Sequence, residues 1–404
     1  MTASLRRRSV GALVLALGLI VIASVEPTPL AAQAPPEVSG SSDWRQVSVG
    51  GTSACGVRTT GRLYCWGDNT QDQIGRGSDT ASYVTPVEVS PGFTNWTAVS
   101  VGGQHACARR ATGQAYCWGS DAYGQVGDGV PAGNRDAATL VAGGFSDWTS
   151  VSAGDSHTCG RRANGRLYCW GSNGAGKIGD GEETGVRLAP RLVTGGIINW
   201  TSVSAGDSHT CGRRANGQVW CWGADGEGQL GNGGSNGARN VPTLVAGGNP
   251  TWTSVSASGF HTCGRRSNGR IYCWGFDGGG TLGDGPGASS RPTPTLVAGG
   301  VTAWTAVNGG FLHACGRRTN GRLYCWGDGL HGAVGDGTIG INRFTPVAVA
   351  GGATDWTTVE GGGVSTCALT TARRLYCWGE DTAGLLGNGG ADTRQTRPSE
   401  VYSP

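Results

Sequence analysis

Cysteine and histidine, the side chains of this chain that could most readily bind a metal or take part in catalysis, recur at fixed intervals. The 14 cysteines form seven pairs whose members are ten residues apart, and successive pairs are 52 residues apart. Such thiols could form disulfides or hold a metal. Five of the six histidines precede the first cysteine of a pair by two residues: His105, His157, His209, His261 and His313.

A ring of histidines could bind a metal or act as a base. A residue that recurs in most units is instead typical of one that satisfies buried polar groups. We therefore expect a structural role for the histidines, and the sequence predicts no catalytic residue, no metal site and no cofactor.

Each cysteine pair spans a predicted β-hairpin. In the third pair, Asn164 and Gly165 lie midway between Cys159 and Cys169, and Asn-Gly is a strong hairpin signal. If the residues beside this turn pair, the two cysteines face each other within disulfide reach. A zinc site needs more closely clustered ligands. We predict seven disulfides: Cys55–Cys65, Cys107–Cys117, Cys159–Cys169, Cys211–Cys221, Cys263–Cys273, Cys315–Cys325 and Cys367–Cys377.

The N-terminus predicts export. Arg6, Arg7 and Arg8 precede an apolar run at 10–22, and small residues follow at Ala31 and Ala32. This pattern is typical of a secretory signal peptide, here residues 1–32, followed by a short linker at 33–43. An uncleaved membrane anchor is the alternative. We expect a secreted, periplasmic or cell-surface protein, in which paired cysteines are oxidised.

The repeat predicts an all-β fold, a seven-bladed β-propeller at 44–404. Two tryptophan series share the 52-residue period, and 76 glycines favour tight turns over helix. The third unit shows four strand-like segments, at 148–151, 158–161, 166–170 and 190–193, and four strands per unit make a propeller blade. We expect residues 398–402 to pair with the first unit and close the ring. The units are 44–95, 96–147, 148–199, 200–251, 252–303, 304–355 and 356–404.

The charges predict two unlike faces, because arginines gather at the hairpins and acids in the loops at the opposite ends of the strands. The alternative is that both sets of charges are solvated surface residues that only keep the protein soluble. The arginines include Arg109, Arg110, Arg161, Arg162, Arg265, Arg266, Arg317 and Arg318. The acids are Asp121, Asp128, Asp180, Glu182, Glu183, Asp225, Glu227, Asp277, Asp284, Asp328 and Asp336. Removal of the predicted signal peptide takes away three arginines and Glu26, so the formal net charge falls from +3 to +1, which implies no polyanion partner.

Three recurring phrases resemble the repeat of the regulator of chromosome condensation family. They are Gly154-Asp155-Ser156-His157-Thr158, Gly165-Arg166-Leu167-Tyr168-Cys169-Trp170-Gly171 and Gly228-Gln229-Leu230-Gly231. The resemblance implies a seven-bladed propeller. The family's namesake is a nuclear nucleotide-exchange factor that acts through one face and an inserted β-wedge. The signal peptide and the 52-residue period, which leaves no room for an insertion between the repeated landmarks, do not favour that function here. The architecture is also similar to a secreted bacterial member, beta-lactamase inhibitory protein II, which implies a protein-binding disc.

Residues that break the repeat are the candidate binding residues, because a position that varies among units is not demanded by the fold. Most come from the adjacent fifth and sixth units, in two loop sets expected on one face. An alternative is that they fill local gaps. The candidates are Tyr123, Phe260, Phe276, Phe311, Leu312, Leu330 and His331.

The sequence therefore predicts an exported, non-catalytic, monomeric propeller that binds a surface or secreted protein through one face. It predicts no nucleic-acid partner and no membrane contact after signal cleavage. The alternative is an enzyme or lectin-like module with a ligand in the central pocket. That alternative predicts unlike polar residues near the axis, whereas a protein binder predicts aromatic exceptions on a rim.

Overall fold

The computed structural model describes residues 43–403 except 90–92, 132, 236, 249–250 and 288. The predicted signal peptide lies outside the described residues, as does the linker apart from Asp43. Within the described part of the chain, no helix is long and apolar enough to cross a membrane. Helical structure there is limited to three 3-10 turns, η1 (Gly174–Gly176), η2 (Gly278–Gly280) and η3 (Thr382–Gly384).

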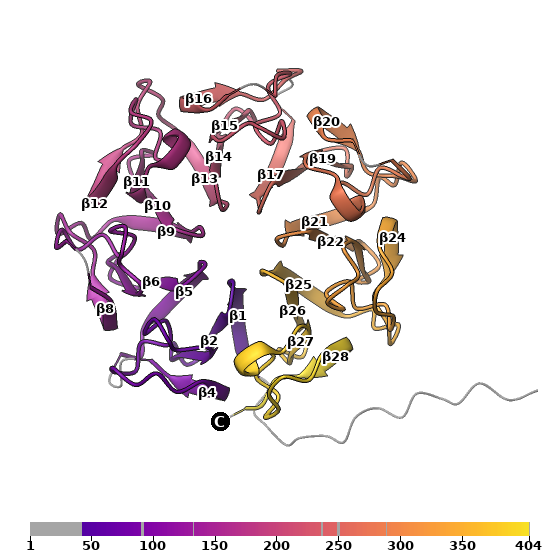
Figure 1. Ribbon diagram of the computed structural model, residues 1–404, viewed down its shortest axis with the longest axis horizontal. Helices are drawn as coiled ribbons and strands as arrows, with labels where there is room; N and C mark the ends of the chain where they lie inside the picture. The colour runs from indigo at the N-terminus through magenta and orange to yellow at the C-terminus, as the bar shows by residue number, and fades with distance from the viewer. Residues whose placement is uncertain are drawn as a thin grey trace, which may run out of the picture. The chain divides into compact units, whose positions relative to one another are not determined.

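The described residues form seven four-stranded antiparallel sheets arranged in a ring, so the predicted seven-bladed propeller is confirmed (Figure 1). We number the blades 1 to 7 in chain order. The first strand of each blade lies nearest the axis, and these strands are β1 (Trp44–Val49), β5 (Trp96–Val101), β9 (Trp148–Ala153), β13 (Trp200–Ala205), β17 (Trp252–Ala257), β21 (Trp304–Gly309) and β25 (Trp356–Gly361).

The second and third strands of each blade carry the cysteines. The second strands are β2 (Ser53–Arg58), β6 (His105–Arg110), β10 (His157–Arg162), β14 (His209–Arg214), β18 (His261–Arg266), β22 (His313–Arg318) and β26 (Ser365–Thr370). The third strands are β3 (Leu63–Gly67), β7 (Ala115–Gly119), β11 (Leu167–Ser172), β15 (Val219–Gly223), β19 (Ile271–Gly275), β23 (Leu323–Gly327) and β27 (Leu375–Gly379).

The fourth strands form the outer edge of the ring. They are β4 (Tyr83–Glu88), β8 (Arg135–Leu140), β12 (Val186–Leu192), β16 (Arg239–Leu244), β20 (Arg291–Leu296), β24 (Arg343–Ala348) and β28 (Gln395–Glu400). In the third unit this strand begins at Val186, earlier than the predicted position 190, because Gly171 and Ser172 at the end of β11 also pair with it.

The hairpin argument for the disulfides is confirmed. The amide of Arg162 donates to the carbonyl of Arg166 at 3.0 Å, and Cys159 lies directly opposite Cys169. The same register recurs in all seven blades, so each predicted pair is bonded within its blade, with Cα atoms 4.0–4.1 Å apart. The described residues include no free cysteine.

Alternation along the third strand gives each blade two different faces. Cys169 and Leu167 point to one face of blade 3, and Tyr168 and Trp170 point to the other. The first face packs against Trp200 and Trp222 of blade 4, while Tyr168 and Trp170 join the cluster that holds the blade 2 disulfide. The core therefore consists of separate layers between blades, each with a disulfide on one side and tryptophan on the other.

The predicted closure of the ring is wrong. Residues 398–400 belong to β28, which pairs with β27 of its own blade, so no strand is shared between blade 7 and blade 1. The two blades meet as other neighbours do. The indole Nε1 of Trp66 donates to the carbonyl of Leu385 at 2.9 Å, and the amide of Gly363 donates to the carbonyl of Gly50 at 2.9 Å.

Removing one disulfide should destabilise the propeller without changing its fold. For the double variant Cys263→Ala/Cys273→Ala, we expect the free energy of unfolding to fall by up to about 3 kcal/mol, because the unfolded chain regains the entropy of a short closed loop. Denaturant titration under oxidising conditions measures this loss. With reductant sufficient to open every disulfide, the variant and the parent should become similar. An unchanged free energy under oxidising conditions would contradict the stabilising role.

Candidate functional site

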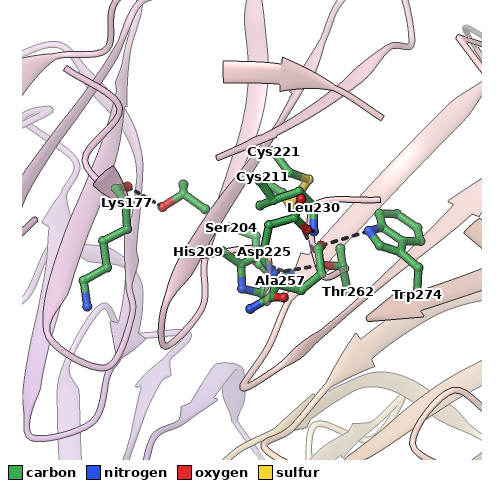
Figure 2. The surroundings of a disulfide bond; sticks show 12 residues. Lys177, Ser204, His209, Cys211, Cys221, Asp225, Leu230, Ala257, Thr262 and Trp274 are labelled. Carbon is green, nitrogen blue, oxygen red and sulfur yellow. Dashed lines mark hydrogen bonds between the residues drawn. A yellow bond between two sulfur atoms is a disulfide. The ribbon is translucent and has the colours of Figure 1, made fainter. Parts of the chain in front are cut away.

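A buried hydrogen-bond chain joins neighbouring blades at the repeated histidines. At the junction of blades 4 and 5, Nε1 of Trp274 and Oγ1 of Thr262 both donate to the carbonyl of Gln229, at 3.0 and 2.8 Å. Because this uses the only hydroxyl proton, Thr262 accepts from Nε2 of His209, 2.8 Å away (Figure 2). Burial lowers the pKa of His209 to about 3, so the ring is neutral. The histidine therefore serves the fold, as predicted.

Three junctions lack this bond. At the junctions of blades 1 and 2 and of blades 7 and 1, serine replaces the histidine and alanine replaces the threonine. The third junction keeps the histidine without its partner. Between blades 5 and 6, Ala314 stands where Thr262 stands one unit earlier. His261 is fully buried, and neither of its ring nitrogens has a hydrogen-bond partner among the described residues. Buried polar groups without partners lower stability. The blade 5–6 junction is therefore less well bonded than the junction shown in Figure 2.

The arginines of the predicted basic face join blades together. Arg317 donates to the carbonyl of Trp356 in the next blade at 3.0 Å. The guanidinium carbon of Arg318 lies 4.6 Å from the centre of the Trp304 ring, a cation–π contact. Equivalent residues behave similarly, so this set of charges is largely committed to the structure.

The predicted acidic face is wrong for seven of the eleven acids on which it was based. Four of them form ion pairs with an arginine seven residues later: Asp128 with Arg135, Asp180 with Arg187, Asp284 with Arg291 and Asp336 with Arg343. The other three are buried and accept a main-chain hydrogen bond within their own loop: Asp121, Asp225 and Asp277. These seven carboxylates are therefore paired or buried, whereas Glu182 and Glu183 of the same set are exposed.

A pocket of about 250 Å³ opens at the axis, where the first strands end. We call this side of the ring the turn face, because the turns between first and second strands lie there. Most of the lining is glycine main chain, and the ionisable side chains that line it are Asp155 and Asp207. Burial and the nearby Asp155 carboxylate raise the pKa of Asp207 to about 7.

Lys177, the only lysine of the chain, lies behind these two acids. It is 6% exposed, and its ammonium donates to Oγ of Ser156 at 2.7 Å and to the carbonyl of Asp207 at 3.0 Å. Burial lowers the pKa of Lys177, and both carboxylates act against this shift. The positive charge of Lys177 thus partly offsets the negative charges of Asp155 and Asp207 at the pocket wall.

The first strands carry a second polar exception near the axis. Ser204 accepts from the amide of Ala257 in the next blade at 2.9 Å, a bond between neighbouring first strands. Asn308 replaces serine in blade 6 and accepts from the amide of Gly361 at 2.8 Å. Its amide also donates to Glu360 at 2.8 Å, and burial raises the pKa of Glu360 to about 7.

Three predicted binding residues form one aromatic cluster on the turn face. Phe260 lies between Phe276 and Phe311, with ring centres 6.2 and 5.4 Å away. Phe260 is 38% exposed, and the other two are half-buried. Phe311 also lines the central pocket. Part of this cluster is therefore available to a partner, and part fills space within the loops.

A smaller hollow of about 120 Å³ adjoins this cluster. Phe311, Leu312, His331 and Val364 line it, so it continues the apolar surface from blade 6 towards blade 7. The neighbouring Leu330 is 54% exposed. His331 lies 3.0 Å from a carboxylate oxygen of Glu380, which also pairs with Arg394.

Tyr123 is the predicted residue that the structure keeps apart. It is 51% exposed, in the loop between β7 and β8 of blade 2, across the ring from blades 5 and 6 (Figure 1). Six of the seven candidates thus gather in one region, and Tyr123 does not join them.

Comparisons with known proteins identify the repeat. The Regulator of chromosome condensation (RCC1) repeat matches residues 60–109, 112–160, 164–212, 216–264 and 320–369, and a second model of this repeat also covers 252–280 and 304–333. The chain belongs to the RCC1 repeat family. The family predicted from the three recurring phrases is thereby confirmed.

Two curated relatives differ greatly in length. The Arabidopsis thaliana ultraviolet-B receptor UVR8 is 26% identical over 347 residues, which cover 85% of this chain and 78% of UVR8. The human E3 ubiquitin-protein ligase HERC2 is 28% identical over 316 residues, which cover 76% of this chain but 6% of HERC2. The chain therefore matches a small part of HERC2.

A solved structure supports the fold. Prp20p from Saccharomyces cerevisiae, described with its binding to Gsp1p and histones, superposes with a TM-score of 0.70 at 20% identity. The match covers 79% of this RCC1-repeat chain and 80% of that chain. At this identity the likeness concerns the propeller fold alone.

Our sequence reasoning missed the polar side chains of the pocket region. Asp155 and Asp207 belong to the repeated phrase Gly-Asp-Ser-His, so they looked like part of the repeat. Only blades 3 and 4 carry aspartate at this position of the phrase, which was a signal that they differ from the other blades. Lys177, Asn308 and Glu360 each stand where most other units carry a different residue. The signal that found the phenylalanines, a break in the repeat, would have found these three as well.

Restoring the missing hydroxyl should stabilise the blade 5–6 junction. In Ala314→Thr, the new Oγ1 can accept from Nε2 of His261 and donate to the carbonyl of Thr281, which already accepts from Trp326. We expect the variant to be more stable than Ala314→Val, which has the same shape without the hydroxyl, by about 1–2 kcal/mol. Denaturant titration of both variants measures the difference, and equal stability would contradict the hydrogen-bond argument.

The stability difference between Glu360→Gln and the parent should depend on pH. Glu360 holds its proton up to about pH 7 in the folded chain, whereas an unfolded glutamate loses it near pH 4.5, so the parent loses stability as the pH rises between these values. Glutamine has no such loss and still accepts from Asn308. We expect the variant's advantage to grow by about 1–3 kcal/mol across this window.

The matched control for this measurement is Glu183→Gln, which removes an exposed carboxylate. Thermal or denaturant unfolding between pH 4.5 and 8 should show a flat difference for Glu183→Gln. A flat difference for Glu360→Gln as well would contradict the raised pKa.

Proposed function

We propose that this RCC1-repeat chain is an exported, non-catalytic propeller that binds a surface or secreted protein through its turn face. The observation that carries the proposal is the exposed aromatic cluster of Phe260, Phe276 and Phe311. Large apolar side chains grouped among polar loops are typical of protein-binding hot spots. The adjoining hollow with Leu312 and Leu330 enlarges that surface.

Two further observations support export and protein binding. Seven disulfides are typical of proteins in oxidising compartments, in keeping with the predicted signal peptide. Prp20p, which shares the fold, is described by its binding to Gsp1p and histones. We do not extend those partners, nucleotide exchange or the ligase activity of HERC2 to this chain, because site residues rather than the fold determine function.

A ligand-binding role is the second candidate. Asp155 and Asp207 in the central pocket, with Asn308 and Glu360 on the neighbouring strands, are the unlike polar residues that such a role requires. The pocket of about 250 Å³ is smaller than those of typical drug-sized ligands, roughly 300–1,000 Å³. We therefore favour protein binding.

The proposal predicts that partner capture depends on the aromatic cluster. The full chain, immobilised, should retain a protein from the culture medium or surface extract of its source cells. We expect Phe260→Ser/Phe276→Ser to weaken this binding about tenfold or more, because it removes the exposed ring of Phe260 and the half-buried ring of Phe276 while the blade core stays intact.

The control for this experiment is Ile198→Ser. Ile198 is similarly exposed, but it lies in the connection before β13, at the hairpin end of the strands, which is the opposite face. Its substitution should leave binding unchanged. Loss of thermal stability in the phenylalanine variant with binding intact would show that these rings serve the core, and would overturn the proposal.

A further inference from the structure

The aromatic cluster and the central pocket form one continuous surface. Phe311 belongs to both, because its ring contacts Phe260 and also lines the pocket. On its other side, Phe311 lines the smaller hollow with Leu312 and Val364. A partner that covers the exposed rings would therefore also lie over the pocket mouth.

The two parts of this surface differ in charge. The aromatic cluster is apolar, whereas the pocket contains Asp155 and Asp207 and no lysine or arginine among its lining residues. Asp155 is exposed, and its Oδ1 occupies the space that a side chain at Gly103 of the neighbouring blade would fill. Lys177 lies behind the wall, and its ammonium is engaged by Ser156 and by the carbonyl of Asp207. The pocket thus carries an excess of negative charge.

The walls also limit what can enter. Glycines from all seven blades line the pocket, and several of their main-chain groups are already bonded between blades. The amides of Asp155 and Asp207, for example, donate to Gly206 and Ser258 at 3.3 and 3.1 Å. A narrow pocket with a main-chain lining and carboxylates on one side suits a single extended cationic side chain.

We propose that the aromatic cluster and the central pocket together form the docking site for a protruding loop of the partner protein. This loop carries a lysine or arginine close to an apolar side chain. The cation enters the pocket beside Asp155 and Asp207, and the apolar side chain packs on Phe260 and Phe311. The inference rests on the proposed function and adds the chemistry of the partner to it.

A cyclic-peptide display library provides the probe. Panning random disulfide-closed loops on the full-length protein should enrich sequences that place lysine or arginine within a few residues of a large apolar side chain. A chosen loop, made as a synthetic peptide, is then measured by calorimetry against variants of the protein. Enrichment of loops without a basic residue would overturn the proposal.

The variants separate the two halves of the site. Asp155→Asn and Asp207→Asn should each weaken the peptide about tenfold, as should Phe260→Ser. The control variants Glu183→Gln and Ile198→Ser should leave its affinity unchanged. A matched peptide with glutamine in place of the basic residue should bind the parent weakly and should not distinguish it from the two asparagine variants. Equal affinity of the basic and glutamine peptides would overturn the proposal.

The pH provides a readout that a purely structural role would not produce. Asp207 titrates at about pH 7 and is faced by Asp155 and Lys177, so the basic peptide should bind several-fold more weakly at pH 6 than at pH 8. This dependence should disappear in Asp207→Asn. Persistence of the same dependence in that variant would contradict a contact between the cation and Asp207.

Failure of this inference and failure of the proposed function give different results. Partner capture that needs Phe260 and Phe276 but is unaffected by Asp155→Asn and Asp207→Asn overturns the docking chemistry and leaves the binding function standing. If free arginine methyl ester displaces the peptide completely while Phe260→Ser leaves peptide affinity unchanged, the pocket is a site for small cations and the proposal is overturned. If neither the phenylalanine variants nor the asparagine variants weaken partner capture, the proposed function itself is overturned.

Discussion

The indole hydrogen bond between neighbouring blades is the contact on which this propeller depends. In each blade the tryptophan of the third strand donates to a main-chain carbonyl of the preceding blade, as Trp274 does to Gln229 and Trp66 does to Leu385. Two residues after the accepting carbonyl comes a glycine. At Gly231 a Cβ atom would lie 2.5 Å from Nε1 of Trp274, so only glycine allows the indole to approach.

This contact also explains how the ring closes. Each blade takes its four strands from one stretch of chain, and the bond of Trp66 to Leu385 gives the blade 7–1 junction the same link as the other junctions. A shared strand is not required when the indole bond and the layer of disulfide against tryptophan recur at the seventh junction. The disulfides then stabilise each blade, while the tryptophans stabilise the ring.

Much of this fold could be predicted from local signals. The period fixes the number of blades, and the Asn-Gly turn fixes the register that opposes Cys159 and Cys169. Ring closure was predicted wrongly, although β28 pairs with β27 of its own blade just as the fourth strand of every other unit pairs with its third. The repeat itself contained the signal for this local pairing. The pairing of the loop acids with arginines was not predicted, although the partners are close in sequence. Asp128 and Arg135 are seven residues apart, as are Asp336 and Arg343.

The candidate site could be predicted only in part, for a physical reason that Lys177 illustrates. The fold uses its main-chain carbonyl, which accepts from Thr210 and Trp222, so the side chain at this position is unconstrained. The equivalent position is occupied by Gln229 in blade 4 and by Ala333 in blade 6. Sequence shows that such a position is free to vary, but only the three-dimensional arrangement shows that Lys177 lies behind two pocket carboxylates.

The least bonded histidine junction coincides with the candidate binding surface. Between blades 5 and 6, His261 has no hydrogen-bond partner, whereas Phe260 and Phe311 contact each other across the same junction. An apolar contact on the turn face thus belongs to a junction that lacks the buried histidine–threonine bond, which four other junctions have. Because a partner seated on these rings would contact both blades, its binding would add cohesion at a junction that lacks this polar bond. Partner binding and the stability of this junction should therefore be thermodynamically linked.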